Sequence, residues 1–192
     1  RPALGEWSMP SARTLSIEVE LLDPGSATDT AAIALQSETD PNYRTPVVPE
    51  ALGLERRAIG VTPTGLKAES RWYLHLLLPV ALTPGHRYDV DLGSLRSPAG
   101  MQLADATLSV TPTADGISSS IKVNQVGYLP EATKIAFVGN WLGDLGPMPV
   151  DDTGFRLVHA GSETEVLSGE MVLRIANDPR SGEDVYTADF SA

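Results

Sequence analysis

The chain has 192 residues, and its 14 basic and 25 acidic side chains give a formal charge of −11, which argues against a nucleic-acid partner because phosphate binding depends on clustered lysine and arginine. It contains no cysteine, so packing rather than disulfides must stabilise it. No apolar run reaches the roughly 18 residues that cross a bilayer, so we expect no membrane span, and the length suits two small domains.

Alternation of apolar and polar residues predicts the first strands. Leu15, Ile17 and Val19 alternate with polar residues, which is the period of a strand with one face in water. Residues 1–13, around Trp7, read as an extended lead-in, and residues 31–36 predict a weaker strand. Residues 37–63 are irregular, with two helical turns expected at 50–57, and a loop of this length is often a place of contact with a partner.

Order returns at residues 70–79, which predict a central strand with Trp72 on its apolar face and Pro79 at its end. The pattern L-x-P-G-x-x-Y from Leu82 to Tyr88 resembles the tyrosine corner of immunoglobulin-like and fibronectin type III sandwiches, whose phenol bonds the backbone upstream. Residues 107–110 predict a last strand. Short strands between glycine and proline turns indicate an all-β fold, with a first domain over residues 1–113.

Small, polar residues at 111–120 predict a domain boundary, and a second patterned block covers residues 119–192. It begins with a half-buried strand at 121–123 and a strand at 134–138 that we expect to be covered on both faces, and four more strand candidates follow. Between the first two lie Asn124, Gln125 and Tyr128. We expect the two amides to bond neighbouring backbone, because a buried amide without a partner costs about 1–3 kcal/mol.

The motif N-Q-x-G-Y-x-P, which places Asn124, Gln125, Gly127 and Tyr128, is followed far along the chain by D-F-S, with Asp189 and Phe190. The pair resembles the immunoglobulin-like domain that precedes the catalytic domain of family 9 glycoside hydrolases, the cellulase-type endoglucanases. The resemblance covers about residues 119–192. Together with the sandwich expected for residues 1–113, it implies two tandem immunoglobulin-like β-sandwiches. Because domains of this type have further strands after D-F-S, we expect the second sandwich to lack its last strands within this chain.

The resemblance also implies a function without catalysis in this chain. Family 9 enzymes invert at the anomeric carbon with a pair of acidic residues, which lie in a helical barrel downstream, and no segment here matches their motifs. The chain would therefore be an accessory region that packs against and stabilises that barrel, in a secreted or periplasmic bacterial-type enzyme. Its start at Arg1 shows no leader pattern, so we expect a signal that was removed or left out of the sequence.

Other candidates for chemistry are few, and we expect no cofactor. His75, His86 and His159 lack the paired spacing of a zinc site, so we interpret them as structural. A glycine- and proline-rich insert holds the densest acidic segment, with Asp144, Asp151 and Asp152. These carboxylates are interpreted as part of a solvated loop, because the regular spacing of a calcium loop is missing. A calcium site is the alternative.

Aromatic residues offer an alternative function, that of a carbohydrate-binding module contacting β-glucan. Trp141, beside Asn140 in the insert, is a candidate for contact with a neighbouring domain or a glycan, and Trp7 is a second candidate. Trp72 is expected to pack in the core. A surface adhesin built from sandwich repeats remains a third interpretation.

Overall fold

The computed structural model describes residues 3–20, 22–61, 63–65, 68–103, 106–114, 116–162 and 164–191. Within these ranges the chain is all-β, and its only helical segments are 3₁₀ turns of three residues, which confirms the predicted fold class. None of the described helices has the length and apolar character needed to span a bilayer. The backbone divides into two compact units, Arg1–Ser118 with Leu142–Leu145, and Ser119–Trp141 with Gly146–Ala192.

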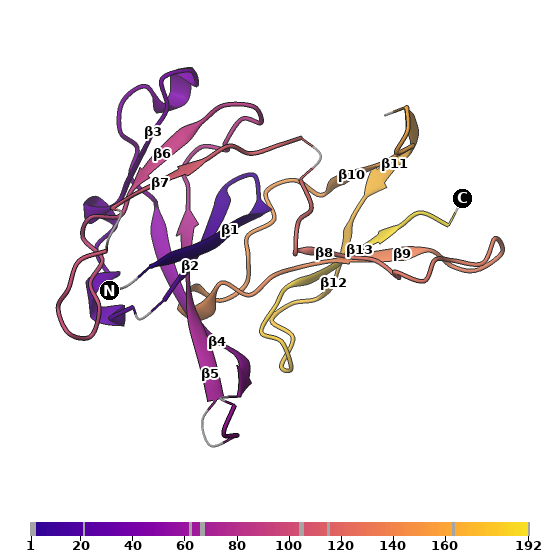
Figure 1. Cartoon of the computed structure of the whole chain (residues 1–192). Helices are drawn as coiled ribbons and strands as arrows, with labels where there is room; N and C mark the ends of the chain where they lie inside the picture. Colours follow the sequence, from indigo (N-terminus) through magenta and orange to yellow (C-terminus); the bar gives the residue numbers. More distant parts are fainter. Residues whose placement is uncertain are drawn as a thin grey trace. The chain divides into compact units, whose positions relative to one another are not determined.

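The first unit consists of two antiparallel sheets (Figure 1). One sheet has the strand order β1-β2-β5-β4, with β1 at Leu4–Ser11, β2 at Thr14–Val19, β4 at Ala51–Val61 and β5 at Ala68–Leu77. The other has the order β3-β6-β7, with β3 at Ala34–Gln36, β6 at Tyr88–Asp91 and β7 at Thr107–Val110. The turns η1 (Pro24–Ser26), η2 (Thr30–Ala32) and η3 (Pro41–Tyr43) lie in the connections before and after β3.

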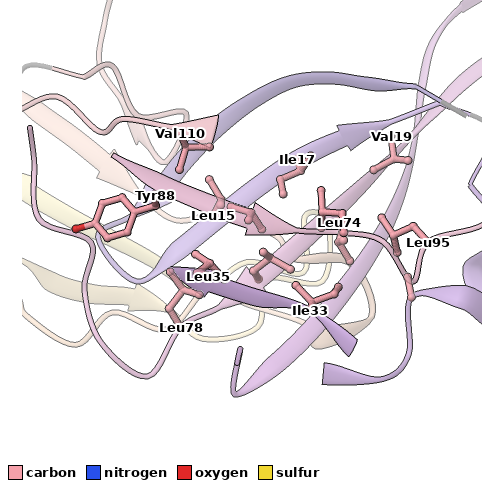
Figure 2. Close-up of a cluster of buried hydrophobic side chains, with 14 of the residues drawn as sticks. Leu15, Ile17, Val19, Ile33, Leu35, Leu74, Leu78, Tyr88, Leu95 and Val110 are labelled. Atoms are coloured by element: carbon pink, nitrogen blue, oxygen red, sulfur yellow. The ribbon is translucent and has the colours of Figure 1, made fainter. Parts of the chain in front are cut away.

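The core of the first unit lies between these sheets (Figure 2). Alternate residues of β2 and β5 point inward, as the period of two requires, and meet side chains of the other sheet and its loops. The fully buried members include Leu15, Ile17, Val19, Leu74, Leu76 and Leu78 from the first sheet and the residue after β5, and Ile33, Leu35, Tyr88, Val90, Leu92 and Leu95 from the second sheet and its connections.

Tyr88 ties the loop before β6 to the strand. Its hydroxyl accepts a hydrogen bond from the Thr83 amide at 2.7 Å, five residues upstream, and donates one to Asp40 Oδ2 at 2.5 Å. The hydrogen bond from Tyr88 lowers the pKa of the buried Asp40 carboxyl. The Tyr43 ring meets Tyr88 edge-on, with centroids 5.1 Å apart, and donates its own hydroxyl proton to the Val80 carbonyl. This is the geometry of a tyrosine corner.

Two local expectations for the first unit are wrong. Residues 50–57 were expected as helical turns, but residues 51–57 belong to β4, which pairs with β5 from Ala51 to Val61 with one irregularity after Ala58. Tertiary pairing thus overrides the local helical preference. Residues 1–13, of which 1 and 2 lie outside the described residues, are extended as expected, but instead of a lead-in they contain the paired strand β1, which forms a hairpin with β2 through the pair Ser11↔Thr14. Trp7 lies partly buried in β1 and packs against the core.

The alternation in β2 predicts that its polar face lies in water, and this is also wrong. Thr14, Ser16 and Glu18 are buried. Glu18 pairs with Arg71 and accepts a hydrogen bond from Tyr73 at 3.2 Å, so its charge has partners on the neighbouring strand. Polar residues on a strand therefore do not by themselves indicate a solvated face.

The second unit contains a four-stranded antiparallel sheet in the order β12-β13-β9-β8, and a separate hairpin of β10 and β11 (Figure 1). The strands are β8 (Ile121–Lys122), β9 (Ile135–Val138), β10 (Gly154–Val158), β11 (Glu165–Glu170), β12 (Val172–Ile175) and β13 (Val185–Asp189). The chain passes from β9 to β10 through η4 (Gly143–Leu145), which belongs to the first unit.

The second unit buries few apolar residues. Among its described residues only Ala136, Ala188 and Met148 are buried apolar side chains. Ile135, Phe137 and Val138 in β9 are half-buried, so the expectation that this strand is covered on both faces is wrong. A unit of this size with so small a core has little stability of its own.

Candidate functional site

The loop between β8 and β9 contains the first sequence motif, and Asn124 closes it. The Asn124 side chain accepts a hydrogen bond from the Val126 amide at 3.0 Å and donates one to the Gly127 carbonyl at 2.9 Å. Gly127 has a φ of +105°, which explains why glycine is needed at this turn. Gln125 is exposed, and no hydrogen bond of its side chain is found, so only one of the two amides bonds the backbone, and neither is buried.

The Tyr128 side chain takes the place of a backbone hydrogen bond between β8 and β9. β8 pairs with β9 through two residue pairs, Ile121↔Val138 and Lys122↔Phe137. After Lys122 the chain turns away from β9. At the next position the Tyr128 hydroxyl accepts a hydrogen bond from the Asn124 amide at 3.2 Å and donates one to the Ile135 carbonyl at 2.6 Å. The phenol thus joins two backbone groups that the separated strands leave without a direct bond.

The second motif meets the first at this place. The Phe190 ring lies edge-on to Tyr128, with centroids 5.3 Å apart and an angle of 84°. The Phe190 amide donates to the Lys134 carbonyl at 2.9 Å, and the Lys134 amide donates to Ser191 Oγ at 2.8 Å. Ser191 bonds Asp189 and lowers the pKa of its carboxyl. The two motifs form one structural cluster, which the sequence showed only as two separate signals.

A groove of about 390 Å³ opens beside this cluster. Its apolar walls are formed by Tyr128, Phe137, Val123 and Ile135. Lys122, at its edge, is occupied, because its Nζ donates to the Gly139 carbonyl at 2.7 Å and pairs with Glu183 at 3.2 Å. A ligand in this groove would therefore contact mainly apolar side chains, because the charge of Lys122 is already paired.

The second unit has further exposed apolar side chains in β8, in the loop after it, and on strands β10, β11 and β12. Val126 and Val172 are two of them, 98% and 65% exposed. The others are Ile121, Val123, Leu129, Leu157, Val158, Val166, Leu173 and Ile175. We call these ten residues the apolar surface of the second unit. Exposed apolar side chains mark an interaction site where they form a contiguous patch.

The aromatic candidates are largely engaged within the protein. Trp141 is half-buried, and its six-membered ring lies against Gly182, where an added Cβ would come within 2.5 Å of the ring. Asn140, also half-buried, accepts a hydrogen bond at its carbonyl from the Met148 amide at 2.9 Å. Trp72 packs partly against the core, with Arg56 over its ring at 5.9 Å.

The acidic candidates are exposed. Asp144 accepts a hydrogen bond from the Leu54 amide at 2.7 Å, and Asp152 accepts one from the Gly154 amide at 2.8 Å. Asp151 lies beside Asp152 in the sequence and is exposed. In the described ranges no group of three or more His, Cys, Asp and Glu side chains is placed to hold a metal ion. Asp152 thus stabilises the backbone of its own turn, whereas Asp144 bonds a strand 90 residues away in the sequence.

One polar row was not foreseen from the sequence. Ser16 Oγ lies 2.7 Å from His75 Nδ1, and His75 Nε2 lies 3.4 Å from Glu55 Oε2 without the alignment of a hydrogen bond. Burial opposes ionisation of Glu55, but its interactions with His75 and Arg57 outweigh burial and lower its pKa. Ser16 and His75 are only 5% and 2% exposed, so this row of serine, histidine and carboxylate cannot reach a substrate. The strand register brings these residues together, and no spacing in the sequence reveals it.

Residues 117–192 match the family model of the cellulase N-terminal Ig-like domain. No curated protein sequence matches the chain. Among solved structures, the N-terminal part of the bacterial S-layer protein SbsC is 12% identical, with a TM-score of 0.45 over 100% of this chain and 41% of that one. A pullulanase from Anoxybacillus sp. LM18-11 is 13% identical, with a TM-score of 0.26 over 97% of this chain and 22% of that one. The chain thus spans less than half of these structures.

Proposed function

We propose that this chain, whose residues 117–192 match the cellulase N-terminal Ig-like domain, is the non-catalytic N-terminal region of a family 9 glycoside hydrolase. Its role is to pack against the downstream catalytic barrel and stabilise it during polysaccharide degradation. The family match carries this proposal. A secreted or periplasmic location follows from it, since polymeric β-glucan lies outside the cell.

The apolar surface of the second unit supports the docking role. Burial of one valine-sized side chain stabilises by about 1.5–3 kcal/mol, so the ten residues of this surface represent a large unused contribution. The groove beside Tyr128 and Phe137 adds a concave, mainly apolar place on the same unit. A catalytic domain that covers this surface gains stability from the contact.

The experiment compares two matched substitutions in the full-length enzyme. Val172→Asp introduces a charge at a 65% exposed position of the apolar surface, and Val61→Asp does the same at a 66% exposed position of β4 in the first unit. We expect Val172→Asp to lower the unfolding midpoint of the catalytic domain by about 5 °C or more, and Val61→Asp to leave it unchanged. Circular dichroism of the 192-residue chain checks that both variants fold.

Equal midpoints for the two variants and the parent would refute docking through this surface. Hydrolysis of a soluble β-glucan by the 192-residue chain alone would refute the non-catalytic role. The midpoints are measured on the full-length enzyme and the hydrolysis on the 192-residue chain, so the two parts of the proposal are tested separately.

A second candidate function is contact with β-glucan through Trp141. The observation that favours it is a half-buried indole held in place against Gly182, which leaves part of a fixed aromatic ring open to a sugar face. Affinity electrophoresis on soluble β-glucan tests it. Retardation that disappears in Trp141→Ala supports this function, and retardation that is absent from the parent chain refutes it.

A further inference from the structure

The first unit contains a short stretch from far along the chain. Leu142–Leu145 belongs to it, while Trp141 before and Gly146 after belong to the second unit. We call these four residues the clip segment. Leu142 is fully buried, Gly143 is buried, and the segment lies against β4, the edge strand of its sheet. The backbone thus passes from the second unit into the first for four residues and then returns, so both ends of the clip segment are attached to the second unit.

A side-chain hydrogen bond fixes the clip segment to the strand edge. Asp144 Oδ1 accepts from the Leu54 amide at 2.7 Å, and the Leu145 amide approaches the Leu142 carbonyl at 3.4 Å within the turn. The carboxylate thereby satisfies a backbone donor of β4 that has no further strand beside it. Hydrogen bonds to ionised groups are about twice as strong as neutral ones.

Two glycines permit the close approach. A Cβ added to Gly53 in β4 would overlap the Leu142 carbonyl oxygen, and one added to Gly143 would overlap the Leu54 carbonyl. Gly143 also has a φ of +66°, which L-residues rarely adopt. The segment is therefore seated by complementary backbone shape and cannot be replaced by an arbitrary loop.

The flanks of the clip segment belong to the weakly packed second unit. Trp141 pairs with Pro147 in a bridge, and the Met148 amide donates to the Asn140 carbonyl at 2.9 Å, so the loop ends are joined immediately beside the clip. Seating four residues fixes both ends of this loop and reduces the entropy cost of closing it. The unit that benefits has only three buried apolar side chains among its described residues.

We propose that the clip segment is a lock that makes the folding of the second unit depend on the edge of β4. Release of the clip loosens the second unit while the core of the first unit stays folded. This proposal concerns the stability of the chain alone and does not depend on a catalytic partner.

Residue-resolved hydrogen exchange by NMR on the whole chain tests the lock. Asp144→Ala removes the bond to Leu54, and Asp144→Asn keeps an oxygen that can accept it. Asp152→Ala is the matched control, because Asp152 also accepts one backbone bond in the same insert but does not touch β4. The amides of Gly139 and Phe190 report on the second unit, and the amide of Leu35 reports on the first.

We expect Asp144→Ala to accelerate exchange at Leu54, Gly139 and Phe190 by about tenfold or more. Leu35 should change little, Asp144→Asn should have a smaller effect, and Asp152→Ala should leave Gly139 and Phe190 at the parent rate. Gly143→Ala, which removes the seat without changing charge, should reproduce the pattern.

Fast exchange at Leu54 with unchanged exchange at Gly139 and Phe190 would overturn the lock. Continued protection of Leu54 in both Asp144→Ala and Gly143→Ala would overturn the claim that these residues hold the clip.

Discussion

Tyr128→Phe removes one oxygen from the centre of the motif cluster and keeps the ring against Phe190. The lost hydroxyl bonds the Asn124 amide at 3.2 Å and the Ile135 carbonyl at 2.6 Å. Each such bond contributes about 0.5–1.5 kcal/mol net, and because Tyr128 is half-buried, water can replace part of the loss. We therefore expect the second unit to lose about 1–2 kcal/mol.

Urea denaturation followed by NMR signals of residues 119–141 and 146–191 measures this loss in the unit concerned. Tyr186→Phe is the matched control, because Tyr186 is also half-buried in the second unit and no hydrogen bond of its hydroxyl is found. The Asn124 amide should also exchange faster in Tyr128→Phe. If Tyr128→Phe and Tyr186→Phe were equally stable, the bridging role of the phenol would be wrong.

Two further substitutions test other contacts. Gly182→Ala places a methyl group within 2.5 Å of the Trp141 ring at a φ of +74°, whereas Gly65→Ala, the control, has a similar φ of +68° and open space around it. The free energy of unfolding in urea should therefore be lower in Gly182→Ala than in Gly65→Ala by about 1–3 kcal/mol. Equal stability of the two variants would contradict the packing of Trp141 on Gly182. The hydrogen bond from Tyr88 lowers the folded-state pKa of Asp40, so its contribution is present above the unfolded pKa of about 3.9 and is lost as the pH falls through the folded value. Urea midpoints measured from about pH 6 to 2 should therefore fall less steeply in Asp40→Asn than in the parent chain, and parallel curves would refute this linkage.

Much of the fold follows from local patterns. The alternation around Leu15 and Ile17 indicates a strand with one buried face, and both residues are in the core. The spacing from Leu82 to Tyr88 indicates a tyrosine corner, and the phenol bonds the Thr83 amide. These features depend on neighbours in the sequence, so the sequence reveals them.

Features that depend on distant partners were missed. β4 looked helical at Glu55 and Arg56 because the pairing with β5 is not visible locally. Asp144 was interpreted as part of a solvated loop because its bond to Leu54 spans 90 residues of sequence. The row of Ser16, His75 and Glu55 requires the register of three strands, which no single strand encodes.

In the proposed enzyme, the catalytic domain covers the apolar surface of the second unit. Hydrogen–deuterium exchange of the same peptides, measured in the 192-residue chain and in the full-length enzyme, tests it most directly. The account predicts that Val172–Ile175 and the loop containing Val126 exchange more slowly in the full-length enzyme, while the β4–β5 hairpin end near Val61 exchanges equally in both. Equal exchange of Val172–Ile175 and the Val126 loop in the two proteins would contradict it.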